Sequence, residues 1–316
     1  MKKSYSLKKP ILITGATGFV GANLVRYFVS KNIKINIILR KDSKKWRIKD
    51  IINKTDFFYA DLKDEKKLQK IINVIKPKTI FHLAAHGAYS YQSDFKTIKT
   101  TILDGTMNLL NACKKHNFNI FINTGSSSEY GFKKEKMSET NVLVPNSYYS
   151  AFKSAATLYC QFESLKSNLP IITVRPFHVY GPYEEPTRLI PTLMRDLIQN
   201  NKSKLVSPHI SRDLIHIDDV IDFYIMIAKK YNLRGEIFNL GFGKKTTIKQ
   251  IYDYLKGITN SKISSNWNSL KNRSWDQTQW YSDMSHTKKK LGWSPKIGYK
   301  KGLYKTLTWY KNFYNK

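Results

Sequence analysis

Short apolar runs alternate with amphipathic stretches over more than half of this 316-residue chain, and this alternation restricts the fold more than any other feature. The runs have the length of buried strands, and between them apolar residues recur every three or four positions, as on one face of a helix. Such repeats build an α/β, doubly wound parallel sheet. The expected strands are Ile11–Thr14, Ile35–Leu39, Phe57–Tyr59, Thr79–Leu83, Ile120–Thr124 and Ile171–Arg175, and the expected helices are Ala22–Ser30, Lys66–Val74, Thr106–Lys115 and Tyr149–Leu165.

The alternation ends near Gly181, where prolines become frequent and the expected elements become shorter. We therefore expect two domains, a cofactor-binding sheet domain over residues 1–180 and a smaller C-terminal substrate-binding lobe over residues 181–316. The run Phe238–Gly241 has the pattern of another strand. A segment near residues 238–241 is thus expected to return to the sheet.

The formal net charge of +31 raises the question of a nucleic-acid partner. The lysines are scattered as pairs along the chain and form no stripe on a single element, so we expect no nucleic-acid binding. A positive field does favour a small anionic substrate such as a diphosphate.

The sequence gives little indication of a membrane protein or a metalloprotein. No stretch approaches the ~18 apolar residues that span a bilayer, and the basic segment Met1–Pro10 lacks the apolar region of a signal peptide. The cysteines, Cys113 and Cys160, have no partner at metal-ligand spacing. We expect a cytoplasmic protein with no membrane contact, no disulfide and no metal.

A glycine-rich turn follows the first expected strand and opens the first helix. Gly15 permits a tight turn, Gly18 lets backbone amides approach a pyrophosphate at the helix N-terminus, and Gly21 allows close packing of helix on strand. This position in a strand–turn–helix predicts a dinucleotide site. Its expected contacts are Gly15, Thr17, Gly18, Phe19 and Val20.

The end of the second strand distinguishes the two nicotinamide cofactors, because a carboxylate there accepts the ribose 2′-hydroxyl and an arginine binds a 2′-phosphate. The strand ends in Arg40, with Ser43 and Lys44 close behind. We therefore expect NADP(H), with NAD(H) as the alternative. Asp61 after the third strand is interpreted as a partner of the adenine amino group or as a helix N-cap.

Tyr149 and Lys153 lie four residues apart, which places both side chains on one face of a helix. A lysine cation lowers the pKa of a neighbouring phenol and binds ribose hydroxyls, so the tyrosine can exchange a proton with a carbonyl or an alcohol during hydride transfer. Ser126, after the fifth strand, has a hydroxyl suited to the same substrate oxygen. We predict that these three residues are catalytic.

The chain resembles the extended short-chain dehydrogenase/reductase superfamily, because the glycines, the serine, the tyrosine and the lysine occur in the same order. The resemblance is to its NAD(P)-dependent nucleotide-sugar epimerases, dehydratases and reductases in particular. The resemblance covers nearly the whole chain and implies a Rossmann fold. Further matching stretches are His82–Ala85, Gly105–Leu110, Gly125–Gly131, Arg175–Pro182, Arg212–Val220 and Leu291–Pro295. The resemblance implies further cofactor contacts at Leu62, Ala84, Ala85, Pro176 and Val179, and contacts to a nucleotide-diphosphate sugar at Ser127, His178, Arg188, Leu189, Arg212 and Arg273.

Two positions depart from the family pattern. His178 stands where most relatives have an asparagine that contacts the sugar, and Ile102 stands where an asparagine precedes the Gly105 helix. The resemblance also implies a homodimer through the helices Thr106–Lys115 and Tyr149–Leu165, which we expect to carry more apolar surface than one sheet face needs.

The reaction after hydride transfer stays open among several alternatives. A 4,6-dehydratase needs an acidic pair directly after the catalytic hydroxyl residue, where this chain has Ser127 and Ser128, with Glu129 one position later. A 4-epimerase or a 4-ketosugar reductase needs only the catalytic three and the cofactor. A reductase of a non-nucleotide carbonyl, or a non-catalytic cofactor-binding protein, is favoured less by these residues.

Overall fold

The computed structural model describes residues 6–89, 91–133, 135–270 and 278–314 of the chain. The chain divides into two compact units. Unit 1 comprises Met1–Gly131, Leu143–Arg175 and Ile221–Phe238, and unit 2 comprises Phe132–Val142, Pro176–Val220 and Asn239–Lys316. The division at residue 180 into a cofactor domain and a substrate lobe stays a prediction.

Unit 1 is built on a seven-stranded sheet of order β10-β6-β5-β4-β1-β2-β3. Neighbours from β3 to β6 pair in parallel, so the expected doubly wound α/β fold is confirmed. The strands are β1 (Ile11–Thr14), β2 (Asn36–Leu39), β3 (Asp56–Tyr59), β4 (Thr79–His82), β5 (Ile120–Thr124), β6 (Ile171–Pro176) and β10 (Ile237–Leu240).

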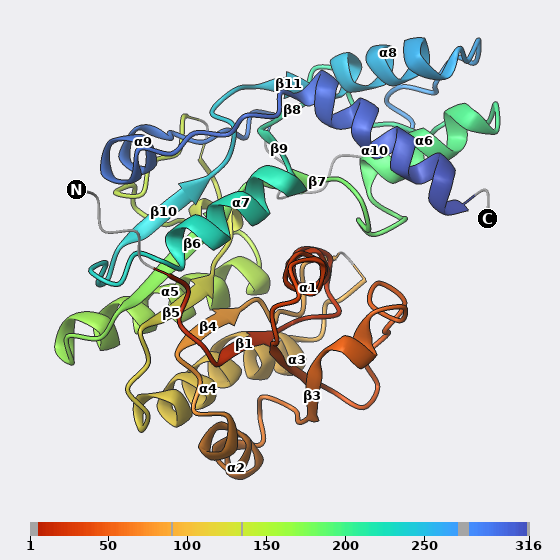
Figure 1. Cartoon of the computed structure of the whole chain (residues 1–316). Helices are drawn as coiled ribbons and strands as arrows, with labels where there is room; N and C mark the ends of the chain where they lie inside the picture. Colours follow the sequence, from red (N-terminus) through yellow and green to blue (C-terminus); the bar gives the residue numbers. More distant parts are fainter. Residues whose placement is uncertain (1–5, 90, 134, 271–277, 315–316) are drawn as a thin grey trace. The chain divides into compact units, whose positions relative to one another are not determined.

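Helices cover both faces of this sheet (Figure 1). The main helices are α1 (Phe19–Ser30), α2 (Glu65–Ile75), α4 (Gly105–Lys114), α5 (Tyr148–Lys166) and α7 (Ile217–Ile227). Two short helices, the 3-10 helix η1 (Ile52–Lys54) and the α-helix α3 (Phe95–Lys99), lie between them in the sequence. On one face, Phe28 of α1 and Tyr224 of α7 pack against Phe81 of β4. The opposite face is covered by α2, α4 and α5, whose buried residues join those of the strands in one apolar cluster.

Both cysteines lie in this apolar cluster. Burial raises the pKa of the Cys113 and Cys160 thiols, so neither is a thiolate near neutral pH.

The segment between α3 and α4 forms a π-helical turn, η2 (Thr100–Asp104). Ile102, which replaces the family's asparagine, lies buried in this turn and packs against Ile98 and Ala156. Its carbonyl oxygen accepts a hydrogen bond from Thr106 Oγ1 over 2.5 Å. The π-helical turn thus has an apolar contact of Ile102 and a hydrogen bond from Thr106, and it lacks the polar side chain that relatives have at position 102.

Unit 2 has a separate core formed by three helices, α6 (Leu189–Ile198), α8 (Ile248–Thr259) and α10 (Tyr299–Tyr314). Two small sheets border it. In one, β7 (His178–Tyr180) pairs in parallel with β9 (Leu214–His216), and in the other, β8 (Ser211–Arg212) pairs antiparallel with β11 (Thr246–Thr247). The short helix α9 (Ser285–Leu291) also belongs to this unit.

None of the helices in the described ranges is long and apolar enough to cross a membrane.

Candidate active site

The glycine-rich turn between β1 and α1 leaves no room for a side chain at Gly15 or at Gly21. Gly15 has φ +70°, and a Cβ added to it would lie 2.6 Å from the backbone nitrogen of Ala84. A Cβ on Gly21 would lie 2.2 Å from the carbonyl oxygen of Gly15. Both glycines are therefore required by close backbone packing, as the sequence predicted.

Gly18 caps the N-terminus of α1 without a side-chain hydrogen bond, and the first turn carries no acidic residue. The backbone amides of Thr17, Phe19 and Val20 belong to the same turn. Because the first-turn amides of a helix lack intrahelical partners, such an uncapped N-terminus fits a phosphate group. The residues present thus suit the pyrophosphate of a dinucleotide.

Arg47 supports this turn and was missed by the sequence analysis. Its side chain is buried, and Nη1 donates to the carbonyl oxygen of Thr17 over 3.3 Å. Arg26 of α1 in turn donates through Nε to the carbonyl oxygen of Arg47 over 3.0 Å. Nothing in the sequence near Arg47 follows a periodic pattern, so no signal distinguished it from the surface lysines around it.

At the end of β2, Arg40 is half-exposed and forms an ion pair with Asp42, with Nε 3.2 Å from Oδ1. After β3, Asp61 Oδ1 accepts a hydrogen bond from the backbone of Lys63 over 3.0 Å. The interpretation of Asp61 as a helix N-cap is wrong, because Asp64 caps α2 by accepting from the Lys67 amide.

Leu62 and the segment after β4 border the same sheet edge. Leu62 is buried, and its Cβ would lie 2.9 Å from a Cβ on Gly105, which requires the glycine at the start of α4. Ala84 packs partly buried against the core, and Ala85 is exposed. These residues lie at the carboxyl ends of the strands, where doubly wound sheets bind ligands.

His82 joins this edge to the π-helical turn. Its Nδ1 lies 2.7 Å from Thr14 Oγ1 and its Nε2 lies 2.9 Å from Thr106 Oγ1. Because Thr106 uses its hydrogen on Ile102, Nε2 of His82 donates and Nδ1 accepts. Complete burial lowers the pKa of His82 to about 3, and Lys153 contributes in the same direction, so the ring is neutral.

The three predicted catalytic residues lie on adjoining elements of unit 1. Ser126 caps η3 (Ser127–Tyr130), which packs against α5, the helix that carries Tyr149 and Lys153. Ser126 Oγ accepts a hydrogen bond from the Ser128 amide over 3.1 Å. Tyr149 packs against the apolar pair Ile98 and Ile102 with Ala156.

Lys153 is buried and donates through Nζ to the carbonyl oxygen of Thr124 over 2.6 Å. Burial lowers its pKa to about 8, while the negative charge of Glu129 favours its charged form. The sequence placed Lys153 correctly on the helix face, but its anchor on β5 was not predicted.

Glu129 and Arg175 form a buried ion pair in which Glu129 Oε2 lies 2.8 Å from Arg175 Nε. Arg175 Nη1 donates to Tyr130 Oη over 3.1 Å. Glu129 follows the two positions where a dehydratase needs its acids, and its carboxylate accepts hydrogen bonds from Arg175 and from the Ser126 amide. Ser127, at the first expected acid position, is also buried.

In unit 2, two of the predicted substrate residues, Arg188 and Arg212, act electrostatically on a third, His178. Burial, together with the guanidinium groups of Arg188 and Arg212, lowers the pKa of His178 to about 3, so His178 is neutral. Arg188 precedes α6 as its N-cap residue, and Leu189 is the first residue of that helix. Pro176 and Val179 flank the same stretch on β6 and β7. Arg273 lies outside the described residues.

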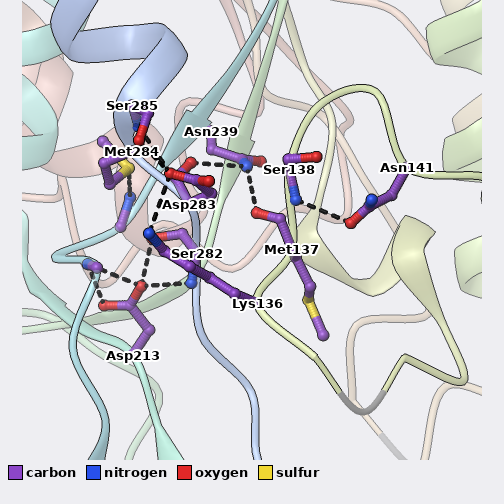
Figure 2. Close-up of polar contacts among 12 residues, drawn as sticks. Lys136, Met137, Ser138, Asn141, Asp213, Asn239, Ser282, Asp283, Met284 and Ser285 are labelled. Carbon is purple, nitrogen blue, oxygen red and sulfur yellow. Dashed lines mark hydrogen bonds and ion pairs between the residues drawn. The ribbon is translucent and has the colours of Figure 1, made fainter.

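Asp213 fixes the strand that carries Arg212 (Figure 2). Its Oδ1 accepts from the Phe242 amide over 2.7 Å, and its Oδ2 accepts from the amide and the hydroxyl of Ser282 over 2.9 and 2.5 Å. A Cβ on Gly241 would lie 2.5 Å from Asp213 Oδ2, so only glycine fits there. This buried carboxylate ties three segments of unit 2 together.

A second group in Figure 2 holds the 132–142 segment in unit 2. Asn239 Nδ2 donates to the carbonyl oxygens of Met137 and Asp283 over 2.9 and 3.2 Å. Lys136 Nζ lies 3.2 Å from Asp283 Oδ1. The segment 132–142, a few residues before the catalytic helix, thus belongs to unit 2, which the sequence did not indicate.

Within the described ranges, no three His, Cys, Asp or Glu side chains are arranged to hold a metal ion.

Residues 11–241 match the model of the NAD dependent epimerase/dehydratase family. The chain belongs to this family. Among relatives of this family member, the dTDP-D-glucose 4,6-dehydratase of Homo sapiens is 25% identical, with 97% of this chain and 91% of the relative covered. An uncharacterized UDP-glucose epimerase of Bacillus subtilis is 27% identical, with 96% and 98% covered.

Solved structures of epimerases have the same fold. The UDP-glucuronic acid 4-epimerase of Bacillus cereus, in complex with UDP-glucuronic acid and NAD, superposes with a TM-score of 0.86 at 26% identity and covers 96% of this chain and 99% of its own. The UDP-glucose 4-epimerase of Thermotoga maritima, solved with UDP-glucose, has a TM-score of 0.88 at 23% identity, with 96% and 99% covered. Like its relatives, this family member is an enzyme of the extended short-chain dehydrogenase type.

Proposed function

We propose that the chain is a nucleotide-sugar 4-epimerase that retains its nicotinamide cofactor through two successive hydride transfers. The observation that carries this proposal is the environment of Glu129. Its carboxylate is fully buried and accepts hydrogen bonds from Arg175 and from the Ser126 amide. The acid that a dehydratase needs is thus already engaged in a structural contact.

A dehydratase must protonate a leaving hydroxyl and remove a proton beside a ketone. The two positions after Ser126 are serines, whose hydroxyls are poor acids near neutral pH. Relatives of the chain include 4,6-dehydratases as well as epimerases. Because Ser127 and Ser128 cannot act as the acids of a 4,6-dehydratase, we infer that the side chains of this chain support hydride transfer without loss of water.

When bound, nicotinamide supplies the hydride acceptor and donor. Tyr149 accepts the proton of the sugar hydroxyl at its phenolic oxygen and returns it in the second half-reaction. The ammonium group of Lys153, one helical turn later, favours the phenolate form of Tyr149. The hydroxyl of Ser126 binds the same sugar oxygen and orients it.

The substrate class follows from unit 2. Arg188 and Arg212 both act on His178 electrostatically, and two guanidinium groups in one region suit a diphosphate through charge-assisted hydrogen bonds. The neutral His178 offers a hydrogen bond to a sugar hydroxyl without attracting the phosphates. We assign Arg273 to the same diphosphate, with Leu189 beside the base.

A 4-ketosugar reductase is the second candidate, and Arg40 is the observation that favours it. A guanidinium at the end of β2 attracts the 2′-phosphate of NADP(H), which a reductase must exchange at every turnover. Asp42, in ion-pair contact with Arg40, acts oppositely because it repels a phosphate and can accept a ribose hydroxyl. We propose NAD(H), the cofactor that the solved Bacillus cereus epimerase holds.

A homodimer is proposed through α5. Its exposed side includes Leu158, Phe162 and Leu165, which are 54%, 55% and 66% exposed and lie on one helical face. The helix α4 was also expected to carry more apolar surface than one sheet face needs, but its Leu109 and Leu110 are fully buried. The helix α5 therefore supplies most of the proposed interface.

The test of the proposed function is incubation of the purified protein with a panel of nucleotide sugars and 4-ketosugars, with and without added NADPH. Products are identified by mass and by NMR. An epimerase yields a product of unchanged mass without added cofactor, a dehydratase yields a product that has lost one water, and a reductase consumes NADPH with a ketosugar.

A further inference from the structure

A buried ion pair joins the catalytic loop to β6, and the proposed mechanism gives it no part in proton or hydride transfer itself. Glu129 is 0% and Arg175 is 1% exposed, and they come from η3 and from β6. A buried pair of charges loses its hydration, and replacement of such pairs by apolar residues is often neutral or stabilising. Stability alone is therefore a weak reason for this pair.

The contacts of Glu129 converge on the segment that carries the catalytic serine. Oε1 of Glu129 accepts from the Ser126 amide over 2.8 Å, and a Cβ on Gly125 would lie 2.3 Å from this same oxygen. Glycine at position 125 is thus needed for the carboxylate to reach the backbone. On the other side, Arg175 holds Oε2 over 2.8 Å.

Lys153 binds the same segment one peptide earlier, through the carbonyl oxygen of Thr124. The stretch Thr124–Ser126 therefore carries the acceptor that orients Lys153 and the hydroxyl of Ser126. The Gly125 amide is held in the sheet by the carbonyl oxygen of Val174, over 2.8 Å. Any shift of this stretch displaces two of the three catalytic side chains together.

We propose that Glu129 and Arg175 are positioning residues for hydride transfer, which hold the Thr124–Ser126 segment so that Ser126 and Lys153 share one geometry. This inference rests on the proposed function for the identity of the reaction. The pair touches neither substrate nor cofactor in this account.

The charge of Glu129 adds an electrostatic effect on Lys153. Burial lowers the pKa of Lys153 to about 8, and Glu129 and Cys160 act in the opposite direction. The neutral His82 on β4 also interacts electrostatically with this lysine, and Tyr149 precedes Lys153 by one turn of α5. Removal of the Glu129 charge should lower the pKa of Lys153 further and deprotonate it at a lower pH.

The experiment compares wild type with Glu129→Gln, which keeps the shape and one acceptor oxygen for the Ser126 amide but removes the charge and the acceptor for Arg175. We expect kcat to fall about ten- to a hundredfold with KM within a few-fold of wild type, since small misplacements of catalytic groups cost this much. The alkaline limb of the kcat profile should move to lower pH by about one unit.

Two further variants separate positioning from folding. Glu129→Gln combined with Arg175→Met leaves no buried charge unpaired, so it should fold even if the single variant does not, and it should keep the lowered kcat and the shifted limb. The matched control is Glu163→Gln, which removes one charge from the Lys114–Glu163 ion pair on α4 and α5. It should leave kcat and the pH profile unchanged.

A readout independent of turnover is the titration of Lys153 followed by ¹³C NMR of its Cε, assigned by the signal missing in Lys153→Arg. A lower titration midpoint in Glu129→Gln supports the inference even if wild type turns over no nucleotide sugar, a result that would defeat only the proposed function. Wild-type kcat, an unmoved alkaline limb and an unmoved midpoint in the folded double variant would overturn the inference.

Discussion

The ammonium nitrogen of Lys153 lies 2.6 Å from the carbonyl oxygen of Thr124 and donates a hydrogen bond to it. This bond joins the catalytic helix α5 to the end of β5. Since Tyr149 lies one helical turn before Lys153, the bond also sets how the phenol is presented. The sheet edge and the helix thus form one support for the proposed proton transfer.

Replacement of Tyr149 by phenylalanine should lower kcat by about 10²–10⁴-fold, the usual effect of a lost acid/base group. Cofactor affinity should stay nearly intact, because the ring still packs against Ile98, Ile102 and Ala156. Steady-state kinetics and cofactor titration by fluorescence measure both quantities. Turnover within a few-fold of wild type would refute the catalytic role of the phenol.

The buried His82 should make stability depend on pH. Its pKa is lowered from 6.5 to about 3 in the folded protein. The neutral ring therefore contributes fully to the free energy of unfolding above the pKa of the unfolded chain, and this contribution is lost as pH falls towards 3. At pH 5 the free energy of unfolding is lower by about 2 kcal/mol because of His82 alone.

His82→Gln should therefore show a flatter fall in unfolding free energy between about pH 7 and pH 5 than wild type does, in chemical denaturation. The control is His209→Gln, because His209 is exposed in the structure and its replacement should leave the slope unchanged. Parallel curves for wild type and His82→Gln would contradict a neutral, buried His82.

Cofactor choice should respond to the Arg40–Asp42 pair. We expect wild type to bind NAD(H) more tightly than NADP(H). Asp42→Asn should raise NADP(H) affinity relative to NAD(H) by up to about tenfold, because an exposed arginine released from its ion pair gains at most a charge-assisted bond to the 2′-phosphate. Calorimetric dissociation constants decide the point, and a wild-type preference for NADP(H) would move the proposal to the ketosugar reductase.

The exposed face of α5 should hold two copies together. Phe162→Glu places a charge in the proposed interface and should yield monomers in light scattering at micromolar concentration, whereas wild type should be a dimer. Val74→Glu is the matched control, because Val74 on α2 is 73% exposed and lies outside the proposed interface. A monomeric wild type would exclude this interface.

Much of the sheet could be predicted because fully buried strands leave a continuous apolar run in the sequence. Ile11–Thr14 and Ile120–Thr124 were predicted with the same bounds that β1 and β5 have. Helix starts were harder, since either Asp61 or Asp64 could cap α2 by residue type, and only the hydrogen bond to Lys67 decides.

The support of the site could not be predicted from patterns. Glu129 and Arg175 are 46 residues apart, and a buried ion pair between distant residues leaves no periodic signal. The membership of the 132–142 segment in unit 2 likewise depends on contacts such as that of Met137 with Asn239. Such long-range polar contacts appear only when the chain is folded.

The central claim, epimerisation at C4 by a retained cofactor, is tested most directly with a nucleotide sugar that carries deuterium at C4. Without added cofactor, we predict that NMR shows the C4 epimer with deuterium still at C4, because the hydride leaves for the bound nicotinamide and returns to the same carbon. Deuterium found at C6 with loss of water, or no turnover of any nucleotide sugar until NADPH and a ketosugar are supplied, would contradict the account.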